Sequence, residues 1–365
     1  MQKLKIGLTP PYPLRKLRKF INTLFVNKLH GHTVKTLAII AQALIEVKRP
    51  ILSELAREIP SPIKFTHRLR RLWRFLAKSR FDYQKACVPL IIWTLTSLKD
   101  RKWLEIMIDW TKIRHYFLLS FSIPYYKRAI PLFWLIAPPD DLDLNKLERE
   151  SLIQFLTLVP IALRVKLVFV ADRGFAKADF FQFLAELKVN FVIRVCGKVW
   201  IKTKDYKGWV KRFPLGAGEI KWLPSVVYHK NKNIGLNLLL KHETDDPLYL
   251  VANIKNAQLV LEIYGHRMRI EEGFRDLKDG LMFKKLKVSQ PEKLGKMWFV
   301  GVIVYLFAFI IGGQVVKNPD LLQEISTVPK HKNSKRLLSI FRVGILIIRR
   351  CQFIKFPLCL QQESA

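Results

Sequence analysis

The sequence predicts a mixed α/β fold preceded by an all-helical region. Apolar residues recur at helical spacing before residue 80, whereas three extended runs follow within residues 103–137. Helical and extended segments then alternate up to residue 195, an order typical of a layered α/β protein. The chain has 365 residues, of which 50% are hydrophobic, so it is long enough for about two domains with a large buried core.

The charge balance of the chain indicates a polyanionic partner. The 63 Lys and Arg residues exceed the 29 Asp and Glu residues, which gives a formal net charge of +34. A surface this positive repels itself unless it meets nucleic acid or an anionic membrane. The four cysteines show no C-x-x-C spacing, so the sequence predicts neither a zinc site nor a disulfide framework and favours a reducing interior.

Two segments bear on a membrane location. Pro10, Pro11 and Pro13 interrupt the N-terminus where a secretory signal needs its apolar run. Met297 to Ile311 carries no charge over 15 residues, which is short of the roughly 18–20 residues that span a bilayer. We interpret this segment as a buried core helix, with membrane insertion as the alternative.

Three helices are predicted in the N-terminal region, at residues 33–47, 51–58 and 64–79. The third helix has one face of apolar residues at helical spacing, namely Leu69, Leu72, Trp73 and Leu76. Its opposite face is basic and carries Arg70, Arg71, Arg74 and Lys78. A helix, a tight turn and a basic helix are the arrangement of a helix-turn-helix motif that reads the DNA major groove. Any small three-helix bundle shares this pattern, so the alternative is a structural bundle.

The elements predicted after the N-terminal region start with an antiparallel meander of three strands. They follow in the order strands 103–110, 113–121 and 125–137, helix 144–156, strand 165–171, helix 176–187 and strand 190–195. Glycines then punctuate short extended runs over residues 197–255, which we interpret as a β-rich insertion outside the central layer. The acidic residues Asp140, Asp141 and Asp143 precede a predicted helix and are interpreted as its N-terminal cap.

A stripe of polar residues follows the insertion, on a helix predicted from Leu261 to Asp276. Tyr264, Arg267, Glu271 and Lys278 are spaced three, four and seven residues apart, which places them on one narrow face of a continuous helix. One interpretation is a surface that holds a phosphodiester beside a metal ion. The other is a solvated face on which Arg267 and Glu271 form an ordinary i,i+4 pair.

Two aspartates follow apolar runs that are predicted as strands. Asp109 follows Leu104 to Ile108, and Asp172 ends the run Leu167 to Ala171. Asp is common as a turn or cap residue at strand ends, so a local structural role is one interpretation. Together with Glu271, the two aspartates would also supply oxygen ligands for a pair of Mg²⁺ ions that catalyses phosphoryl transfer.

These residues resemble a known family, the DDE-type bacterial insertion-sequence transposases of the fourth insertion-sequence family, which carry a Tyr-Arg-Glu-Lys signature. The pattern Tyr-x2-Arg-x3-Glu-x6-Lys is met by Tyr264, Arg267, Glu271 and Lys278. Asp109-Trp110-Thr111 resembles the first aspartate motif of the family, and Asp172-Arg173-Gly174-Phe175 resembles the second. The resemblance covers about residues 100–315.

The resemblance implies an RNase H-like catalytic core with a β-rich insertion before the glutamate-bearing helix. It also implies cut-and-paste transposition by a homodimer that holds two ends of double-stranded DNA, the terminal inverted repeats, and joins them to target DNA. Asp109, Asp172 and Glu271 would bind two Mg²⁺ ions, for which Mn²⁺ would substitute. Tyr264, Arg267 and Lys278 would bind DNA phosphates. Such a protein acts in the bacterial cytoplasm, at the nucleoid and not at a membrane.

We therefore expect five regions along the chain. They are a helical, basic DNA-binding region (1–98), the first part of the core (99–196), the insertion (197–256), the completion of the core with the glutamate helix (257–318) and a basic helical tail (319–365). The expected function is a transposase that cleaves and transfers DNA strands in the presence of Mg²⁺. The alternatives are a catalytically silent DNA-binding derivative and a nuclease with the same core.

Overall fold

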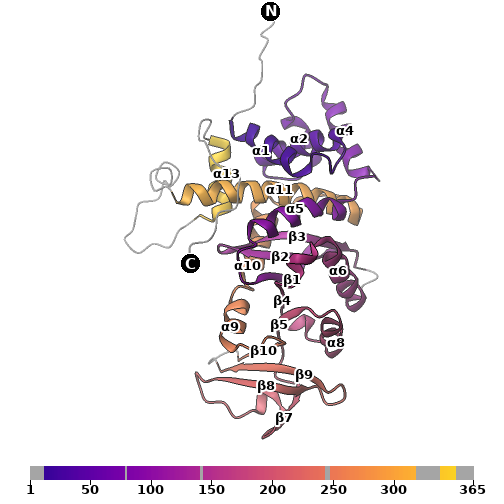
Figure 1. Ribbon diagram of the computed structural model, residues 1–365. Helices are drawn as coiled ribbons and strands as arrows, with labels where there is room; N and C mark the ends of the chain where they lie inside the picture. Colours follow the sequence, from indigo (N-terminus) through magenta and orange to yellow (C-terminus); the bar gives the residue numbers. More distant parts are fainter. Residues whose placement is uncertain (1–11, 79, 140–142, 243–246, 318–337, 351–365) are drawn as a thin grey trace, which may run out of the picture. The chain divides into compact units, whose positions relative to one another are not determined.

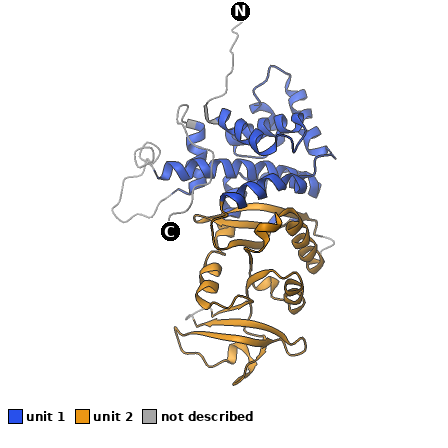
Figure 2. Cartoon of the chain, viewed as in Figure 1, with its two compact units in different colours: residues 1–97, 112–116, 273–365 blue, residues 98–111, 117–272 orange. Residues whose placement is uncertain are grey.

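A computed structural model describes residues 12–78, 80–139, 143–242, 247–317 and 338–350 of the protein (Figure 1). The chain divides into two compact units (Figure 2). The first, here the helical unit, comprises Met1–Ser97, Lys112–Tyr116 and Gly273–Ala365. The second, here the sheet unit, comprises Leu98–Thr111 and Phe117–Glu272.

The described helical unit is built mainly from α-helices. They are α1 (Tyr12–Phe25), α2 (Gly31–Val47), α3 (Leu52–Glu58), α4 (Phe65–Ala77), α5 (Tyr83–Ser97), α11 (Pro291–Val316) and α13 (Ile340–Arg350). The three predicted N-terminal helices are confirmed as α2, α3 and α4, whereas α1 and α5 were not predicted. The expected basic residues Lys330, Lys332, Lys335 and Arg336 of the C-terminal tail lie outside the described residues.

Helix α11 is the buried core helix that the uncharged segment predicts, but it is longer than that segment. It has 26 residues and is apolar on every side, which is typical of a helix packed all round. Among the described residues, α11 is the helix long and apolar enough to cross a membrane, yet 83% of its apolar window is buried within the protein. Glycines let α13 approach it closely, because a Cβ on Gly312 would lie 1.9 Å from the Ile340 carbonyl oxygen.

Ten described strands form one mixed sheet in the order β3-β2-β1-β4-β5-β10-β9-β8-β6-β7. The first five are β1 (Leu104–Ile113), β2 (Tyr116–Tyr125), β3 (Arg128–Ala137), β4 (Leu167–Ala171) and β5 (Asn190–Arg194). Strands β4 and β5 run parallel, and β4 also runs parallel to β1. The predicted order of meander, helix, strand, helix and strand is therefore confirmed, with strand ends shifted by a few residues.

Helices cover both faces of these strands in the sheet unit (Figure 1). Helices α6 (Leu144–Leu158), α7 (Ile161–Arg164) and α8 (Ala178–Glu186) belong to the connections between β3, β4 and β5. Helix α9 (Ala257–Gly265) packs on β5, on the side opposite α6 and α8. Asp143 caps α6 as expected, since its Oδ1 accepts a hydrogen bond from the Lys146 backbone N–H at 3.1 Å. Asp140 and Asp141 lie outside the described residues.

The insertion was expected to lie outside the central layer, and this prediction is wrong: its strands continue the central sheet. They are β6 (Trp200–Lys202), β7 (Lys207–Trp209), β8 (Ile220–Tyr228), β9 (Ile234–Lys241) and β10 (Leu248–Ala252). Strand β10 pairs antiparallel with β5, with Leu250 opposite Arg194 and Ala252 opposite Val192. The physical reason is that β5 would otherwise be an edge strand with unpaired backbone groups.

Candidate active site

The parallel register of β1 and β4 places the two predicted aspartates side by side. Leu104 pairs with Leu167, and the pairing runs on to Ile108 and Ala171. Asp109 and Asp172 are the next residues on each strand, so both carboxylates lie at the carboxyl edge of the parallel strands. Asp109 lies within β1 rather than at its end, because β1 continues to Ile113.

Asp172 has the local role that its strand-end position predicts and a second contact as well. Its Oδ1 accepts a hydrogen bond from the Gly174 backbone N–H at 2.8 Å, which caps the short 3₁₀ helix η1 (Arg173–Phe175). Its Oδ2 lies 3.5 Å from Nη2 of Arg267. Capping therefore fixes the orientation of the carboxylate and leaves one oxygen facing the site.

The single helix expected from Leu261 to Asp276 is interrupted, so the prediction of one continuous polar stripe is wrong. Helix α9 ends at Gly265 and α10 (Arg269–Arg275) begins four residues later. The turn between them is tight, because the Arg267 N–H donates to the Tyr264 carbonyl three residues earlier at 2.9 Å. A π-helical turn, Asp276–Gly280, follows α10 and carries Lys278, which belongs to the helical unit.

A half-buried pair holds this turn against the sheet. His266 Nδ1 lies 2.7 Å from Oε2 of Glu105 on β1. Glu105 and Asp109 are four residues apart on the same strand, so their side chains share one face of the sheet. Glycine at position 265 weakens the helix at the same point. The interruption therefore brings the next residue, Arg267, over the aspartates.

The guanidinium of Arg267 is the centre of the candidate active site. Its Nη2 lies 3.3 Å from Oδ2 of Asp109, and its Nη1 lies 2.5 Å from Oε1 of Glu271. With the Asp172 contact, all three predicted carboxylates converge on this one cation, which is only 12% exposed. The i,i+4 pair of Arg267 and Glu271 exists, but it is part of a larger cluster.

The electrostatics show that the cluster carries too little positive charge for three carboxylates. Burial raises the pKa of Asp109 to about 7 against the attraction of Arg267, and repulsion by Asp172 and Glu271 adds to the increase. Burial by itself would lower the pKa of the Arg267 guanidinium, but the three carboxylates raise it above its ordinary value. A further cation beside Asp109 would relieve this repulsion.

The donor set fits a hard divalent cation by its chemistry. All three side chains offer carboxylate oxygens, which are the ligands that Mg²⁺ prefers. Their present arrangement is set by the guanidinium, and the described residues contain no group of three or more His, Cys, Asp or Glu side chains arranged as metal ligands. The carboxylates would have to rearrange around an ion.

Tyr264 lies beside the same cluster and has a partner that sequence reasoning missed. Burial raises the pKa of its hydroxyl, whereas Arg267 and a side-chain hydrogen bond from Arg194 oppose the increase. Arg194 is the last residue of β5, the third parallel strand. Arg194 could have been predicted from its position at the end of a strand, because the carboxyl ends of the parallel strands β4 and β5 lie at the same edge of the sheet. Glu272, by contrast, points elsewhere, since its Oε2 lies 3.3 Å from Nη1 of Arg128.

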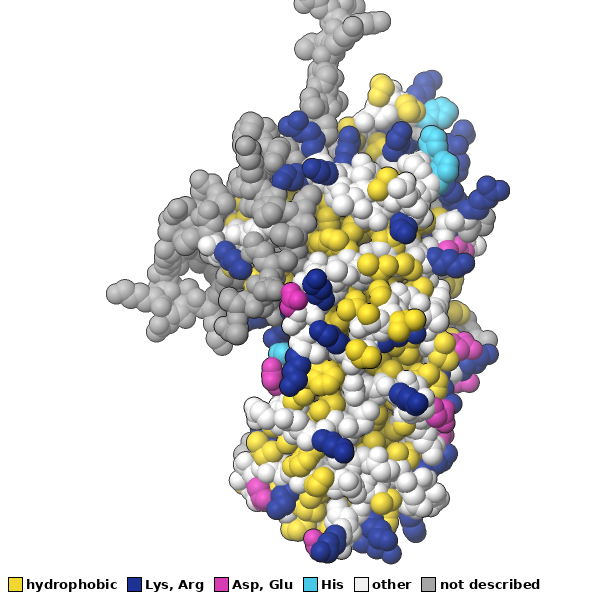
Figure 3. All heavy atoms as spheres, viewed as in Figure 1, with side chains coloured by type: hydrophobic (Ala, Val, Ile, Leu, Met, Phe, Trp, Pro, Cys, Tyr) yellow, Lys and Arg dark blue, Asp and Glu magenta, His cyan; other side chains and the backbone are white. Residues whose placement is uncertain are grey.

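Only part of the predicted DNA-binding face of α4 is exposed; the rest contacts α2. Arg70 and Arg74 are exposed, and Lys and Arg side chains are spread over the face shown in Figure 3. Arg71 instead donates to Thr36 Oγ1 on α2, with its Nη2 at 3.0 Å. Lys78, which follows α4, donates to Oγ1 of Thr33, also on α2, at 2.7 Å. Arg71 and Lys78 are therefore half-buried against α2, and charge alone does not reveal a polar partner on a neighbouring helix.

The apolar face of α4 also differs from the prediction. Trp73, expected in the core, is 44% exposed, whereas Phe75 is 4% exposed. Arg68 joins α4 to α3, because its Nη1 donates to the Ile59 carbonyl at 2.8 Å and to the Arg57 carbonyl at 3.1 Å. These contacts satisfy carbonyls at the C-terminal end of α3. The two helices are therefore held in a fixed relation.

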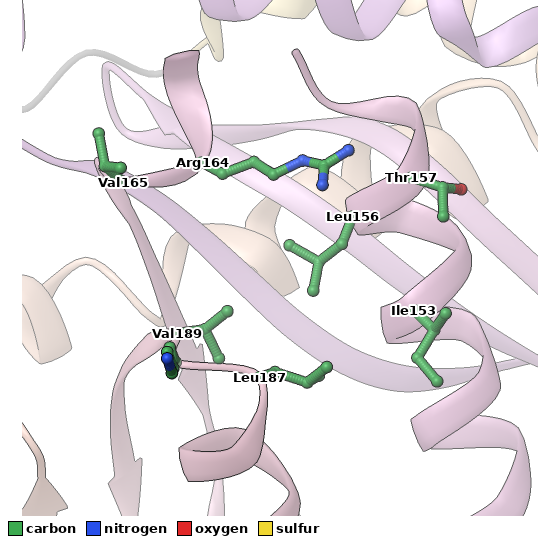
Figure 4. A pocket seen from close by; sticks show the side chains of 8 residues that line it. Ile153, Leu156, Thr157, Arg164, Val165, Leu187 and Val189 are labelled. Atoms are coloured by element: carbon green, nitrogen blue, oxygen red, sulfur yellow. The ribbon is translucent and has the colours of Figure 1, made fainter. Parts of the chain in front are cut away.

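A separate cavity of about 330 Å³ lies in the sheet unit (Figure 4). Its walls include Ile153 and Leu156 of α6, Val165 before β4 and Val189 before β5. Because β4 and β5 are parallel, these amino ends lie at the edge opposite Asp172. The cavity is therefore not part of the carboxylate cluster.

A comparison with protein-family models matches part of the chain. Residues 145–307 match the family model of the transposase DDE domain. The matched segment contains Asp172, Tyr264, Arg267 and Glu271, and it begins after Asp109. The match supports a DDE-type transposase, an enzyme that processes DNA. A search of curated proteins gave no match.

Proposed function

We propose that the protein is a DDE transposase of the insertion-sequence type that cuts DNA at the ends of its element and joins them to target DNA. The observation that carries the proposal is the convergence of Asp109, Asp172 and Glu271 on Arg267. The proposed core is RNase H-like, supported by a meander followed by two parallel strands with helical connections. The transposase domain match supports the same reaction class.

In the proposed reaction, Asp109, Asp172 and Glu271 would hold two Mg²⁺ ions, and Mn²⁺ would substitute. The bound ions would supply activation of the attacking hydroxyl and stabilisation of the leaving oxygen. The chain itself positions the carboxylates through the β1–β4 register and through the cap that Asp172 forms on η1. Burial of Asp109 and Arg267 excludes water from one side of the cluster.

The remaining signature residues bind DNA in this proposal. Arg267 and Tyr264 would contact phosphates beside the cut strand, and Lys278 is proposed as a further DNA-binding residue. Arg267 Nε is a buried donor without a hydrogen-bond partner among the described residues, so it would meet a phosphate once the guanidinium turns away from the carboxylates. A phosphate oxygen is an acceptor that suits it. Arg194 would hold the Tyr264 hydroxyl in place.

End recognition is assigned to the exposed side of α4. Arg70 and Arg74 would bind the inverted repeats, while Arg71 and Lys78 would hold α4 against α2 through their threonine partners. The arrangement of α3 and α4, locked by Arg68, supports a helix-turn-helix role. The active form would be a homodimer that holds two ends, in the cytoplasm at the bacterial nucleoid.

The test combines purified protein, Mg²⁺ and DNA that carries the element's own flanking inverted repeats. Cleavage and joining are read separately, for wild type and for Asp172→Ala. We expect both reactions in wild type and end binding without cleavage in the variant. Cleavage without joining would identify a nuclease, and binding without cleavage by wild type would identify a silent derivative.

A further inference from the structure

Glu148 is a buried carboxylate that the proposed reaction leaves without a role. It lies on α6 and is only 3% exposed. Its Oε1 accepts a hydrogen bond from Nε1 of Trp110 at 3.0 Å, and its Oε2 lies 3.2 Å from Nζ of Lys177. Burying a charge is costly unless it is paired and hydrogen-bonded, and here both oxygens have partners.

The two partners of Glu148 belong to the two aspartate motifs. Trp110 follows Asp109 directly on β1, and successive side chains of a strand point to opposite faces. Glu148 therefore holds β1 from the face opposite the Asp109 carboxylate and does not itself join the cluster. This places it on the face that α6 and α8 cover.

Lys177 is connected to Asp172 by a short, hydrogen-bonded segment. The Phe175 N–H donates to the Asp172 carbonyl at 3.2 Å, and the Lys177 N–H donates to the Phe175 carbonyl at 2.8 Å. Lys177 is also the N-cap residue of α8. Through Lys177, Glu148 therefore fixes the turn that begins at Asp172.

The surroundings of Glu148 also connect it with the site electrostatically. Burial raises its pKa, the Trp110 and Lys177 contacts lower it, and the negative charge of Asp172 raises it again. The effect of Asp172 shows that the two carboxylates lie close enough to interact.

We propose that Glu148 is a positioning residue that ties Trp110 to Lys177 and so fixes the separation of the Asp109 and Asp172 carboxylates for a divalent cation. The inference rests on the proposed function, because it assigns the cation to these carboxylates. Removing a residue that orients a metal ligand without binding the metal itself typically lowers metal affinity by about 10–100-fold. A purely structural role, in which Glu148 only attaches α6, would lower stability and leave metal affinity unchanged.

The test measures Mn²⁺ affinity by titration calorimetry of the full-length protein, so that it does not depend on cleavage. The heat of Mn²⁺ binding that is lost in Asp109→Ala is assigned to binding at the carboxylate cluster. We expect Glu148→Ala to weaken this binding by about 10–100-fold. Glu150→Gln is the matched control, because Glu150 lies on the same helix and forms an exposed pair with Lys146; it should bind as wild type does.

A second pair of variants covers the case in which Glu148→Ala does not fold. Lys177 is 36% exposed, so its replacement leaves no cavity in the core, although Glu148 then keeps only the hydrogen bond from Trp110. Lys177→Ala should weaken Mn²⁺ binding by about tenfold, and Lys177→Arg should restore most of it, since the ion pair is kept. Circular dichroism and thermal melts establish that each variant is folded at the temperature of titration.

The outcomes separate this inference from the proposed function. Folded Lys177→Ala and Glu148→Ala proteins that bind Mn²⁺ like wild type would overturn the positioning role even if wild type cleaves DNA. A wild type that shows no cluster-dependent Mn²⁺ binding would overturn it as well. If wild type binds Mn²⁺ with the expected variant pattern and does not cut its DNA ends, the positioning role stands and the transposase proposal fails.

Discussion

Replacing Asp109 with Asn is expected to stabilise the metal-free protein at pH 8, although the change removes a charged partner of Arg267. The wild-type carboxylate is only 13% exposed and lies near two other carboxylates. Burial and this repulsion raise its pKa from 3.8 to about 7 despite the nearby guanidinium. The ionised form is therefore unfavourable in the folded state, and Asn has no charge to bury.

The size of the effect follows from the raised pKa. At 1.36 kcal/mol for each pKa unit, the difference corresponds to about 4 kcal/mol when Asp109 is ionised. Because Arg267 and the remaining carboxylates readjust around Asn, we expect about half of this, roughly 2 kcal/mol. For a cooperative unit of 150–250 residues, that is an increase in melting temperature of about 4–8 °C.

The dependence on pH has a definite sign. Between about pH 4 and pH 7 the unfolded chain has released the Asp109 proton, whereas the folded protein still binds it. The contribution of this group to wild-type stability therefore falls as pH rises through that window and is constant above it. The advantage of the Asn variant should be close to zero at pH 4 and largest above pH 7.

The assay is thermal unfolding of both proteins from pH 4 to pH 8, in chelator and then in saturating Mg²⁺. Added Mg²⁺ should raise the melting temperature of wild type and not that of Asp109→Asn, which narrows the difference. An Asn variant that melts below wild type at pH 8 in chelator would refute the reasoning. It would mean that the attraction between Asp109 and Arg267 exceeds the cost of burial.

The other predictions concern catalysis and DNA binding. Glu271→Ala should abolish strand cleavage with end binding retained, whereas Glu272→Ala should keep most activity; the opposite result in the cleavage assay would reverse their assignment. Replacing Arg70 and Arg74 with Ala should weaken end binding and lower the slope of log affinity against log salt by about 0.9 for each lost phosphate contact, and an unchanged slope would exclude such contacts. Arg267→Ala should cleave pre-bound DNA about 10²–10³-fold more slowly in single-turnover measurements.

The sequence predicted the residues of the cluster better than their arrangement. Asp109 and Asp172 were found because each follows an apolar run, a local property. Their proximity depends on the register between β1 and β4, which pairs segments more than 60 residues apart along the chain. Register is set by which faces are buried in the folded sheet, so it is not readable from either run alone.

The prediction of a continuous polar stripe on one helix was wrong for a related reason. Spacing correctly paired Arg267 with Glu271, because residues four apart are neighbours on a helix. The interruption after Gly265 depends on Glu105, a residue of β1 about 160 positions earlier that holds His266. A distant partner of this kind leaves no periodic signal in the sequence.

The α4 prediction shows the same limit in the helical unit. Its amphipathic pattern located a helix correctly, but Arg71, placed on the face opposite the apolar residues, contacts α2, and Trp73, placed among the apolar residues, is exposed. Thr36 supplies an acceptor on α2 that makes the inner position suitable for a guanidinium. Hydrophobicity scales rate Arg as polar and Trp as apolar whatever the neighbouring helix offers. They therefore misplace the boundary between the buried and exposed faces of α4.

The structure also changes what loss of Arg267 should do to folding. For an exposed pair with Glu271, removal would cost about 0.2–0.5 kcal/mol. Arg267 is only 12% exposed and touches three carboxylates, so Arg267→Ala leaves them without a cation. Removing one partner of a buried pair costs about 3–5 kcal/mol, and partial exposure of Asp172 and Glu271 reduces this.

Arg267 therefore has two proposed roles, neutralising the carboxylates and contacting DNA phosphate, and adding metal ions distinguishes them. Without metal, Arg267→Ala should melt below wild type because the carboxylates repel one another. Saturating Mg²⁺ should restore most of the lost stability, since it supplies the missing positive charge, but it cannot replace a contact to DNA phosphate. Cleavage of pre-bound DNA should then remain slow in a protein as stable as wild type. If Mg²⁺ restored stability and cleavage together, Arg267 would act only on the carboxylates, and its DNA contact would be refuted.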